Sequence, residues 1–251
     1  MALLEVVRGA GFAGLTFGAG TLVFLSVARA HGHPAKRVAR DRWSGTWARA
    51  LLTLFGVELA VTGDPTVEGP DVGRVVVANH RSIIDIAVLL SLFGGAVVSR
   101  GDIEHWPIIG PAARAAGTIF VDRASKRSGA QAIQAMVDRL ELHDTVCVFP
   151  EGTTFVDDPV RPFKPGACVA AGRAHVPVVP VAIVYPLGSG AAFGGESFAR
   201  HLARLAETKR TRVYVEIGAP MRPTPDEPLE LFTERCRCEV DRLLQVGRAR
   251  G

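Results

Sequence analysis

Cysteine, tyrosine and tryptophan are scarce in this chain, which has four, two and three of them among 251 residues. The cysteines lack CXXC spacing, which argues against zinc and thiol-redox motifs, and we expect small, reduced, apolar residues in a cytoplasmic protein. No recognition-helix pattern or aromatic platform accompanies the net charge of +4, so we expect no nucleic-acid partner. A GXSXG elbow is also missing, so the sequence predicts no serine nucleophile. The cysteines are Cys147, Cys168, Cys236 and Cys238.

Short hydrophobic segments that end in polar residues dominate the rest of the chain. Four of them span residues 74–78, 117–123, 145–149 and 176–183. Their β-branched composition is typical of interior strands, and apolar residues at helical spacing follow the first strand and residue 125. A further alternating strand is predicted at 212–218 and a final helix from Asp226. The hydrophobic content of 48% can bury one substantial core, which predicts an α/β domain.

The segment NHRSIID, residues 79–85, follows the first strand at its carboxyl end. Ligands of open α/β sheets bind at that edge. A neutral imidazole such as His80, held by a carboxylate such as Asp85, can take a proton from a hydroxyl group. The simpler alternative is that Ser82 and Asp85 form a capping box, in which Asp85 accepts backbone amides at the start of a helix.

Polar residues also follow two other predicted strands. Glu151 and Gly152 lie on the loop after 145–149, and Gly152 would allow a ligand to approach the backbone closely. Arg123 stands at the exit of 117–123. The carboxyl ends of the four strands can therefore converge on one site.

The order and spacing of NHRSIID, GTIFVDR, FPEGT and VPVVPVAI, within residues 75–184, resemble the glycerolipid acyltransferase family, which includes bacterial 1-acylglycerol-3-phosphate acyltransferases. The resemblance implies a mixed, largely parallel sheet flanked by helices, with N-terminal membrane-associated helices. It implies transfer of a fatty acyl group from acyl-CoA or acyl carrier protein to a glycerolipid hydroxyl. No metal, cofactor or prosthetic group is implied.

The resemblance makes His80 the general base and Asp85 its orienting partner. We expect backbone amides at the start of the following helix to stabilise the oxyanion, and direct attack by the acceptor hydroxyl without an acyl-enzyme. Lys164 could equally be a solvated loop lysine. The predicted substrate-binding residues are Asn79, Arg81, Arg100, Arg123, Glu151, Gly152, Thr153, Thr154 and Lys164.

Two departures from the family pattern leave the acceptor open. Thr154 stands where the family commonly has Arg, which removes a cation that could hold a phosphate. Arg100 stands where Lys is usual. The segments SRGDIEHWP and FPEGTT resemble more closely those of family members that acylate lyso-ornithine lipid or other lysophospholipids. The first expectation is 1-acyl-sn-glycerol 3-phosphate as acceptor and phosphatidic acid as product. A non-catalytic lipid-binding protein is the alternative of a different class.

The N-terminal region predicts contact with membrane lipids. Residues 10–28 carry no charge and are about long enough to cross a bilayer as a helix, although four glycines leave a re-entrant or interfacial helix open. A signal peptide cleaved after Ala28-Arg29-Ala30 is the competing interpretation.

The residues that follow suit the membrane surface. Residues 43–61 fit an amphipathic or core-packing helix. We expect residues 1–62 to form a membrane-associating helical region and residues 63–251 the catalytic domain, on the cytoplasmic face of the inner membrane. The basic and aromatic residues expected at the lipid head groups are Arg29, Lys36, Arg37, Arg40, Arg42, Trp43 and Trp47.

Overall fold

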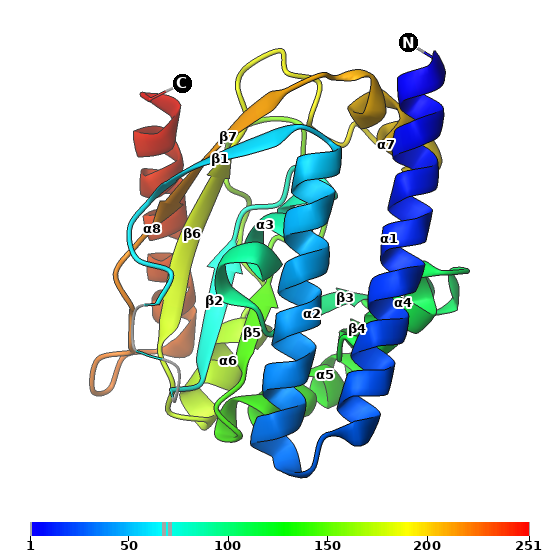
Figure 1. The fold of residues 1–251 in the computed structure, drawn as a ribbon. Helices are drawn as coiled ribbons and strands as arrows, with labels where there is room; N and C mark the ends of the chain where they lie inside the picture. The colour runs from blue at the N-terminus through cyan, green and yellow to red at the C-terminus, as the bar shows by residue number, and fades with distance from the viewer. Residues whose placement is uncertain (1, 67–68, 70–71, 251) are drawn as a thin grey trace.

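The computed structural model describes residues 2–66, 69 and 72–250, and within these ranges the chain forms a seven-stranded sheet covered by helices on both faces (Figure 1). The strands run in the order β1-β7-β6-β2-β5-β3-β4. β6 and β7 are antiparallel, and the other neighbours in the described sheet are parallel, which confirms the predicted fold class. The strands are β1 (Val57–Thr62), β2 (Arg74–Ala78), β3 (Ala96–Arg100), β4 (Ile119–Val121), β5 (Thr145–Val148), β6 (Val178–Val184) and β7 (Thr211–Ile217).

Helices α2, α3 and α7 cover one face of the sheet, whereas α5, α6 and α8 cover the other. Figure 1 shows α1 beside α2, with α8 across the sheet from both. The helices are α1 (Ala2–Arg29), α2 (Gly32–Leu54), α3 (Ile84–Phe93), the 3₁₀-helix η1 (Gly101–His105), α4 (Ile109–Ala115), α5 (Lys126–Glu141), α6 (Gly166–Arg173), α7 (Phe198–Glu207) and α8 (Leu229–Arg248).

The central strand β2 is buried along its whole length, which explains its unbroken hydrophobic run. Because successive side chains of a strand point to opposite faces, Val76 packs in the cluster that contains Leu89 of α3. Val77 packs in the other cluster, which contains Phe232 of α8. Both faces of β2 are therefore core, and its carboxyl end opens onto the site.

The predicted helix after residue 125 and the strand at 212–218 are confirmed as α5 and β7. Ser125 caps α5 by accepting a hydrogen bond from the backbone N of Ser128 at 3.1 Å. The final helix begins at Leu229 and not at Asp226, so that prediction is wrong by three residues. Asp226 has φ of 62°, a left-handed conformation that a helix start cannot use.

The predicted helix over 43–61 is too long at its carboxyl end. α2 ends at Leu54, and Gly56 turns the chain with φ of 66° into β1, which pairs with β7 at the edge of the sheet. A Cβ at Gly56 would lie 2.2 Å from the carbonyl O of Lys209, so only glycine fits this turn. β1 thus joins the sheet from within residues 1–62, and the division after residue 62 stays a prediction.

Helix α1 confirms the helical part of the N-terminal prediction. Its residues Leu4–Arg29 are long and apolar enough to cross a membrane, by length and composition. The two tryptophans of α2 point back to this helix, since Nε1 of Trp47 donates to Thr16 and Nε1 of Trp43 donates to Ser26. Arg40, expected at lipid head groups, is instead buried and paired with Asp144.

Candidate active site

His80 and Asp85 form a hydrogen-bonded pair at the carboxyl end of β2. Nδ1 of His80 lies 2.8 Å from Oδ2 of Asp85, which comes from the first turn of α3. The carboxylate can only accept, so Nδ1 carries the proton and Nε2 holds the free lone pair. Phe149 stacks on the imidazole at 4.0 Å between ring centroids, and the His80 side chain is 16% exposed while Asp85 is fully buried. The pair is thus arranged as a base and its orienting partner.

Three further donors fix the Asp85 carboxylate. The backbone N atoms of Arg81 and Ser82 donate to Oδ2 at 2.7 and 2.8 Å, and the Tyr185 hydroxyl donates to Oδ1 at 2.5 Å. Burial, and then the neighbouring negative charge of Asp85, raise the pKa of Tyr185 well above its usual value, so the phenol remains a donor. Asp85 therefore fixes the loop that leads into α3 and also holds His80.

The backbone amides of Arg81 and Ser82 precede α3 and already donate to Asp85. An amide that is engaged by a buried carboxylate offers no free hydrogen for a developing negative charge. The expectation that amides at the start of the helix stabilise the oxyanion therefore concerns other amides and stays a prediction.

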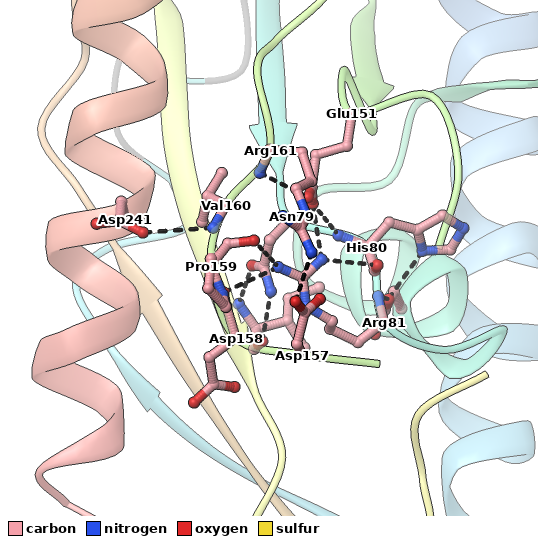
Figure 2. A network of polar contacts seen from close by, with 12 residues as sticks. Asn79, His80, Arg81, Glu151, Asp157, Asp158, Pro159, Val160, Arg161 and Asp241 are labelled. Atoms are coloured by element: carbon pink, nitrogen blue, oxygen red, sulfur yellow. Dashed lines mark hydrogen bonds and ion pairs between the residues drawn. The ribbon is translucent and has the colours of Figure 1, made fainter. Parts of the chain in front are cut away.

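Glu151 organises the loop beside His80 through contacts with protein groups (Figure 2). Its Oε1 accepts from the backbone N of His80 at 2.9 Å and from Nη1 of Arg81 at 2.8 Å. Its Oε2 accepts from the backbone N of Arg161 at 3.0 Å. Arg81 in turn donates to the carbonyl O of Asp158 at 3.0 Å. This buried ion pair ties the β2 and β5 loops together.

Asn79 closes a similar bridge between β2 and β6. Its side-chain amide donates to the carbonyl O of Ile183 and accepts from the backbone N of Ile183, both at 2.8 Å. Asn79, Arg81 and Glu151 are all buried and bonded to protein groups. A substrate contact by any of the three stays a prediction.

The FPEGT loop turns sharply after β5. The backbone N of Gly152 donates to the carbonyl O of Phe149 at 3.0 Å, and Gly152 has φ of 82°. The Lys164 side chain crosses this glycine, because a Cβ there would lie 2.9 Å from Cε of Lys164. Thr153 and Thr154 line the cavity described next, whereas Lys164 is exposed beside the turn.

An apolar cavity of about 650 Å³ lies beside His80. Its polar end carries His80, Arg100, Arg123, Thr153 and Thr154. Helix α1 forms one wall, so the predicted membrane helix is also part of the site. The apolar lining includes Phe12, Val23, Trp47, Leu51, Ile84, Leu90, Ile103, Trp106, Ile109, Phe198 and Leu202.

Two arginines give the polar end positive charge. Arg100 ends β3 and pairs with Val121 of the neighbouring strand β4, two residues before Arg123. Burial, and then the charge of Arg100, lower the pKa of Arg123. Asp102 binds Arg100 in a bidentate pair, with Nε–Oδ1 of 2.8 Å and Nη2–Oδ2 of 2.5 Å. Asp102 therefore compensates part of the positive charge of Arg100.

Sequence reasoning missed Tyr185, the partner of Oδ1 of Asp85. A usable signal existed, since Tyr185 directly follows β6 at the same sheet edge as His80. The contact between His201 and Ser82 was also missed, because no element was predicted for residues 199–211. The amphipathic spacing of Leu202, Leu205 and Ala206 could have indicated α7.

No group of three or more His, Cys, Asp or Glu side chains suited to holding a metal ion occurs in the described ranges. The expectation that this chemistry needs no metal or cofactor stays a prediction.

The matches to known proteins agree with the site. Residues 60–184 match the family model described as Acyltransferase. A lyso-ornithine lipid O-acyltransferase of Pseudomonas aeruginosa is 31% identical over 196 residues, which cover 76% of this chain and 73% of that protein. This chain belongs to the glycerolipid acyltransferase family. The predicted family is confirmed, and the protein is an acyl-transferring enzyme.

Other relatives of this acyltransferase carry two different substrate names. A 1-acyl-sn-glycerol-3-phosphate acyltransferase of Neisseria meningitidis is 31% identical over 147 residues, covering 59% of this chain and 57% of that protein. A lyso-ornithine lipid O-acyltransferase of Brucella abortus is 34% identical over 153 residues, covering 58% and 56%. The chain thus spans little more than half the length of these two relatives.

A solved structure confirms the fold of this acyltransferase. The crystal structure of the 1-acyl-sn-glycerophosphate (LPA) acyltransferase PlsC from Thermotoga maritima aligns with a TM-score of 0.73 at 21% identity. The alignment covers 96% of this chain and 95% of that chain, and so includes the N-terminal helices.

Proposed function

We propose that this acyltransferase transfers a fatty acyl group from acyl-CoA or acyl carrier protein to the free hydroxyl of 1-acyl-sn-glycerol 3-phosphate and forms phosphatidic acid. The observation that carries the proposal is the position of His80, held by Asp85, at the polar end of an apolar cavity beside two arginines. The relative from Neisseria meningitidis, named for this reaction, supports it.

The reaction follows from the free Nε2 of His80. This nitrogen takes the proton of the acceptor hydroxyl as its oxygen attacks the acyl thioester carbon, a role worth about 10²–10⁴ in rate. The tetrahedral intermediate collapses with loss of the donor thiolate, which receives the proton from the imidazolium. Asp85 stabilises the transient positive charge and keeps Nε2 aimed at the cavity, since it holds Nδ1 at 2.8 Å.

The two ends of the cavity suit the two parts of a lysolipid. Apolar walls from α1, α2, α3 and α4 can hold a fatty chain, and Arg123 with Arg100 can hold an anionic head group. Because α1 is both a wall and an apolar helix with exposed side chains, we place it in the membrane. The catalytic site then faces the cytoplasmic side of the inner membrane, where acyl donors are available.

Lyso-ornithine lipid is the second candidate acceptor, and a specific observation favours it. Asp102 already binds Arg100, Thr154 supplies no cation, and Glu196 lines the same cavity as the two arginines, so the lining carries charges of both signs. An ornithine head group also carries both an ammonium and a carboxylate. The relatives from Pseudomonas aeruginosa and Brucella abortus are named for this acceptor.

The test is acyl transfer by membranes that contain the wild type, His80→Ala or the exposed control His31→Ala. Labelled acyl-CoA and acyl carrier protein are each offered with lysophosphatidic acid, lyso-ornithine lipid and a neutral lysolipid. Product from lysophosphatidic acid that depends on His80 and not on His31 is the expected result. A preference for lyso-ornithine lipid would make it the acceptor in place of 1-acyl-sn-glycerol 3-phosphate. No transfer to any acceptor would favour the alternative of a non-catalytic lipid-binding protein.

A further inference from the structure

Beyond Asp85, a row of buried polar side chains has no part in the mechanism above. Tyr185 donates to Oδ1 of Asp85 at 2.5 Å, and the backbone N of Ser82 donates to Oδ2 at 2.8 Å. Nε2 of His201, on α7, lies 3.2 Å from Oγ of Ser82. Ser82 and His201 are both fully buried. Polar groups this deep in a core are costly unless they are joined in a complete network.

This row is not a second nucleophilic centre, although it contains a serine, a histidine and an acid. Nδ1 of His201 lies 2.9 Å from Oε1 of Glu196, so the row contains the three residue types of a Ser-His-acid catalytic triad. A nucleophile must reach its substrate, but Ser82 and His201 have no exposed surface and do not line the cavity. Their role must therefore be exerted through other residues.

The outer end of the row lies in the cavity wall. Glu196 lines the cavity, and Nη2 of Arg204 lies 2.5 Å from Oε1 of Glu196 and 2.8 Å from Nδ1 of His201. Phe193, from the loop between β6 and α7, packs its ring against His201 at 4.9 Å. The row thus connects a wall of the cavity with the carboxylate that holds His80.

The same loop is also attached to the catalytic loop by its backbone. The backbone N of Phe193 donates to the carbonyl O of Arg81 at 2.7 Å. Arg204 donates to the carbonyl O of Ala192 at 2.7 Å. The loop from β6 to α7 and the NHRSIID loop are therefore held together by main-chain and side-chain contacts.

Ser82 links His201 to Asp85 directly. Its hydroxyl O lies 3.2 Å from Nε2 of His201, and its backbone N donates to Oδ2 of Asp85 at 2.8 Å. Nδ1 of His201 faces both the Glu196 carboxylate and the Arg204 guanidinium, at 2.9 and 2.8 Å. Because a hydroxyl can donate or accept, Ser82 can bond to either tautomer of the neutral ring, which burial favours by lowering the pKa of His201.

We propose that His201 is a positioning residue of the acyl transfer. Its hydrogen bond to the Ser82 hydroxyl fixes Ser82, whose backbone N holds Asp85 in the orientation that keeps Nε2 of His80 aligned with the substrates. The inference rests on the proposed role of His80 as the base and extends the active site to α7 and its preceding loop. Small errors in such an alignment can cost about 10²-fold in rate.

The test compares two substitutions of His201 in the full-length protein. His201→Gln retains an amide donor near the position of Nε2, whereas His201→Leu fills the space without a donor. We expect His201→Leu to lower kcat by about 10- to 100-fold, as imperfect alignment does, with KM for donor and acceptor within about twofold. His201→Gln should recover most of that loss. Equal losses in both variants, or a loss confined to KM, would overturn the proposal.

A double-mutant cycle tests the route through Ser82. If His201 acts through the hydroxyl of this residue, His201→Leu should have little further effect on kcat in a Ser82→Ala background. Fully additive effects would contradict the route. Thr233→Val is the matched control, because it removes another buried hydroxyl, bonded to Leu229 at 2.8 Å in α8, and should leave kcat unchanged.

Two additions keep the test decisive. If His201→Leu does not fold, Ser82→Ala removes a single atom of the same chain and should show the same loss in kcat; an unchanged kcat would refute the proposal. If the wild type transfers the acyl group to an acceptor and His80→Ala does not, the proposed function is established whatever the His201 variants do.

If the wild type transfers to no acceptor, the ¹⁵N NMR signals of the His80 ring report directly on the contacts between His201 and Asp85. A shift of the Nδ1–H signal in His201→Leu would support the inference, and an unchanged spectrum would reject it.

Discussion

At the scale of single residues, the site depends on carboxylates with every oxygen engaged. Asp85 accepts four hydrogen bonds and Glu151 accepts three, all from protein donors. Such groups act by fixing geometry, because a buried carboxylate with all its partners in place has one stable orientation. The two carboxylates should nevertheless respond differently to neutralisation, since only Asp85 holds the imidazole of His80, the proposed base.

Asp85→Asn should leave the fold largely intact and lower kcat by about 10²–10⁴. The amide can present a donor to Nδ1 of His80, which would move the imidazole proton to Nε2 and remove the base. Steady-state transfer and thermal unfolding, measured on the same preparation, separate the two effects. A kcat within threefold of wild type would mean that Asp85 only fixes the loop before α3.

Glu151→Gln should act mainly on stability. It leaves the buried guanidinium of Arg81 without its ion partner, a change that typically costs about 3–5 kcal/mol. We expect a lower unfolding midpoint and a loss of activity that excess acceptor does not restore.

The double variant Glu151→Gln with Arg81→Met is the control for that prediction. Removing both charges should recover part of the stability lost by the single variant. An unchanged unfolding midpoint with a raised KM for the acceptor would instead assign Glu151 to substrate binding, as the sequence alone predicted.

At the scale of elements, α1 has two different faces. One face lines the cavity and packs closely on α4, because a Cβ at Gly20 would lie 2.9 Å from Cβ of Ala112. The other face exposes large apolar side chains, among them Phe17 and Phe24. The glycines that weakened the membrane-helix prediction therefore have different roles, and two of them can be compared directly.

Gly20→Ala should destabilise the protein by about 1–3 kcal/mol, because the added methyl group overpacks the contact with the α4 backbone. Gly14→Ala is the matched control, since nothing lies within 4 Å of its added Cβ. The higher helix propensity of alanine should make that variant neutral or more stable by up to about 1 kcal/mol. Equal unfolding midpoints for the two variants would show that α1 does not pack on α4 in solution.

Phe17→Ser and Phe24→Ser should weaken binding to vesicles that contain anionic lipid. These side chains are 67% and 64% exposed, and burying a phenylalanine contributes about 1.5–3 kcal/mol, so each change should cost about 10- to 100-fold in partitioning. Leu231→Ser on α8, at a position 61% exposed, is the control and should bind as wild type. Equal effects at all three positions would contradict membrane contact through α1.

At the scale of the whole molecule, one carboxylate attaches α2 to the far side of the sheet. Asp144, directly before β5, is fully buried and lies 3.0 Å from Nε2 of His33, 3.0 Å from Nη2 of Arg40 and 3.1 Å from Nη1 of Arg139. Burial alone would raise the pKa of Asp144, but Arg40, Arg139 and His33 outweigh it and lower the pKa. The N-terminal helices are therefore anchored electrostatically as well as by packing.

Asp144→Asn should lower the unfolding midpoint at neutral pH and change its pH dependence. Because the folded pKa is depressed, the ionised form contributes stability above the unfolded value of about 3.9, and that contribution is lost as pH falls through the folded pKa. The difference between wild type and variant should thus shrink below about pH 4. Glu234→Gln, which breaks an exposed pair with Arg237, should cost only about 0–1 kcal/mol. A difference that stays constant with pH would contradict this role for Asp144.

The sequence alone determined the parts of this protein that rest on local contacts. The hydrophobic strand segments, the N-cap of α5 and the pair of His80 and Asp85 each depend on contacts within one strand or one turn. Their spacing in the sequence therefore predicts them. The family resemblance added the base and its partner from the same short segment.

Only the tertiary structure decided what lies across long separations in the chain. Tyr185 and His201 contact the NHRSIID segment over separations of 100 and 119 residues. Glu151 accepts from protein donors, and α1 forms a wall of the cavity. No periodicity in the sequence encodes such contacts, because they depend on the order of strands in the sheet and on how helices pack against it. The local segments therefore supplied the chemistry, and the packing of distant elements determined its geometry.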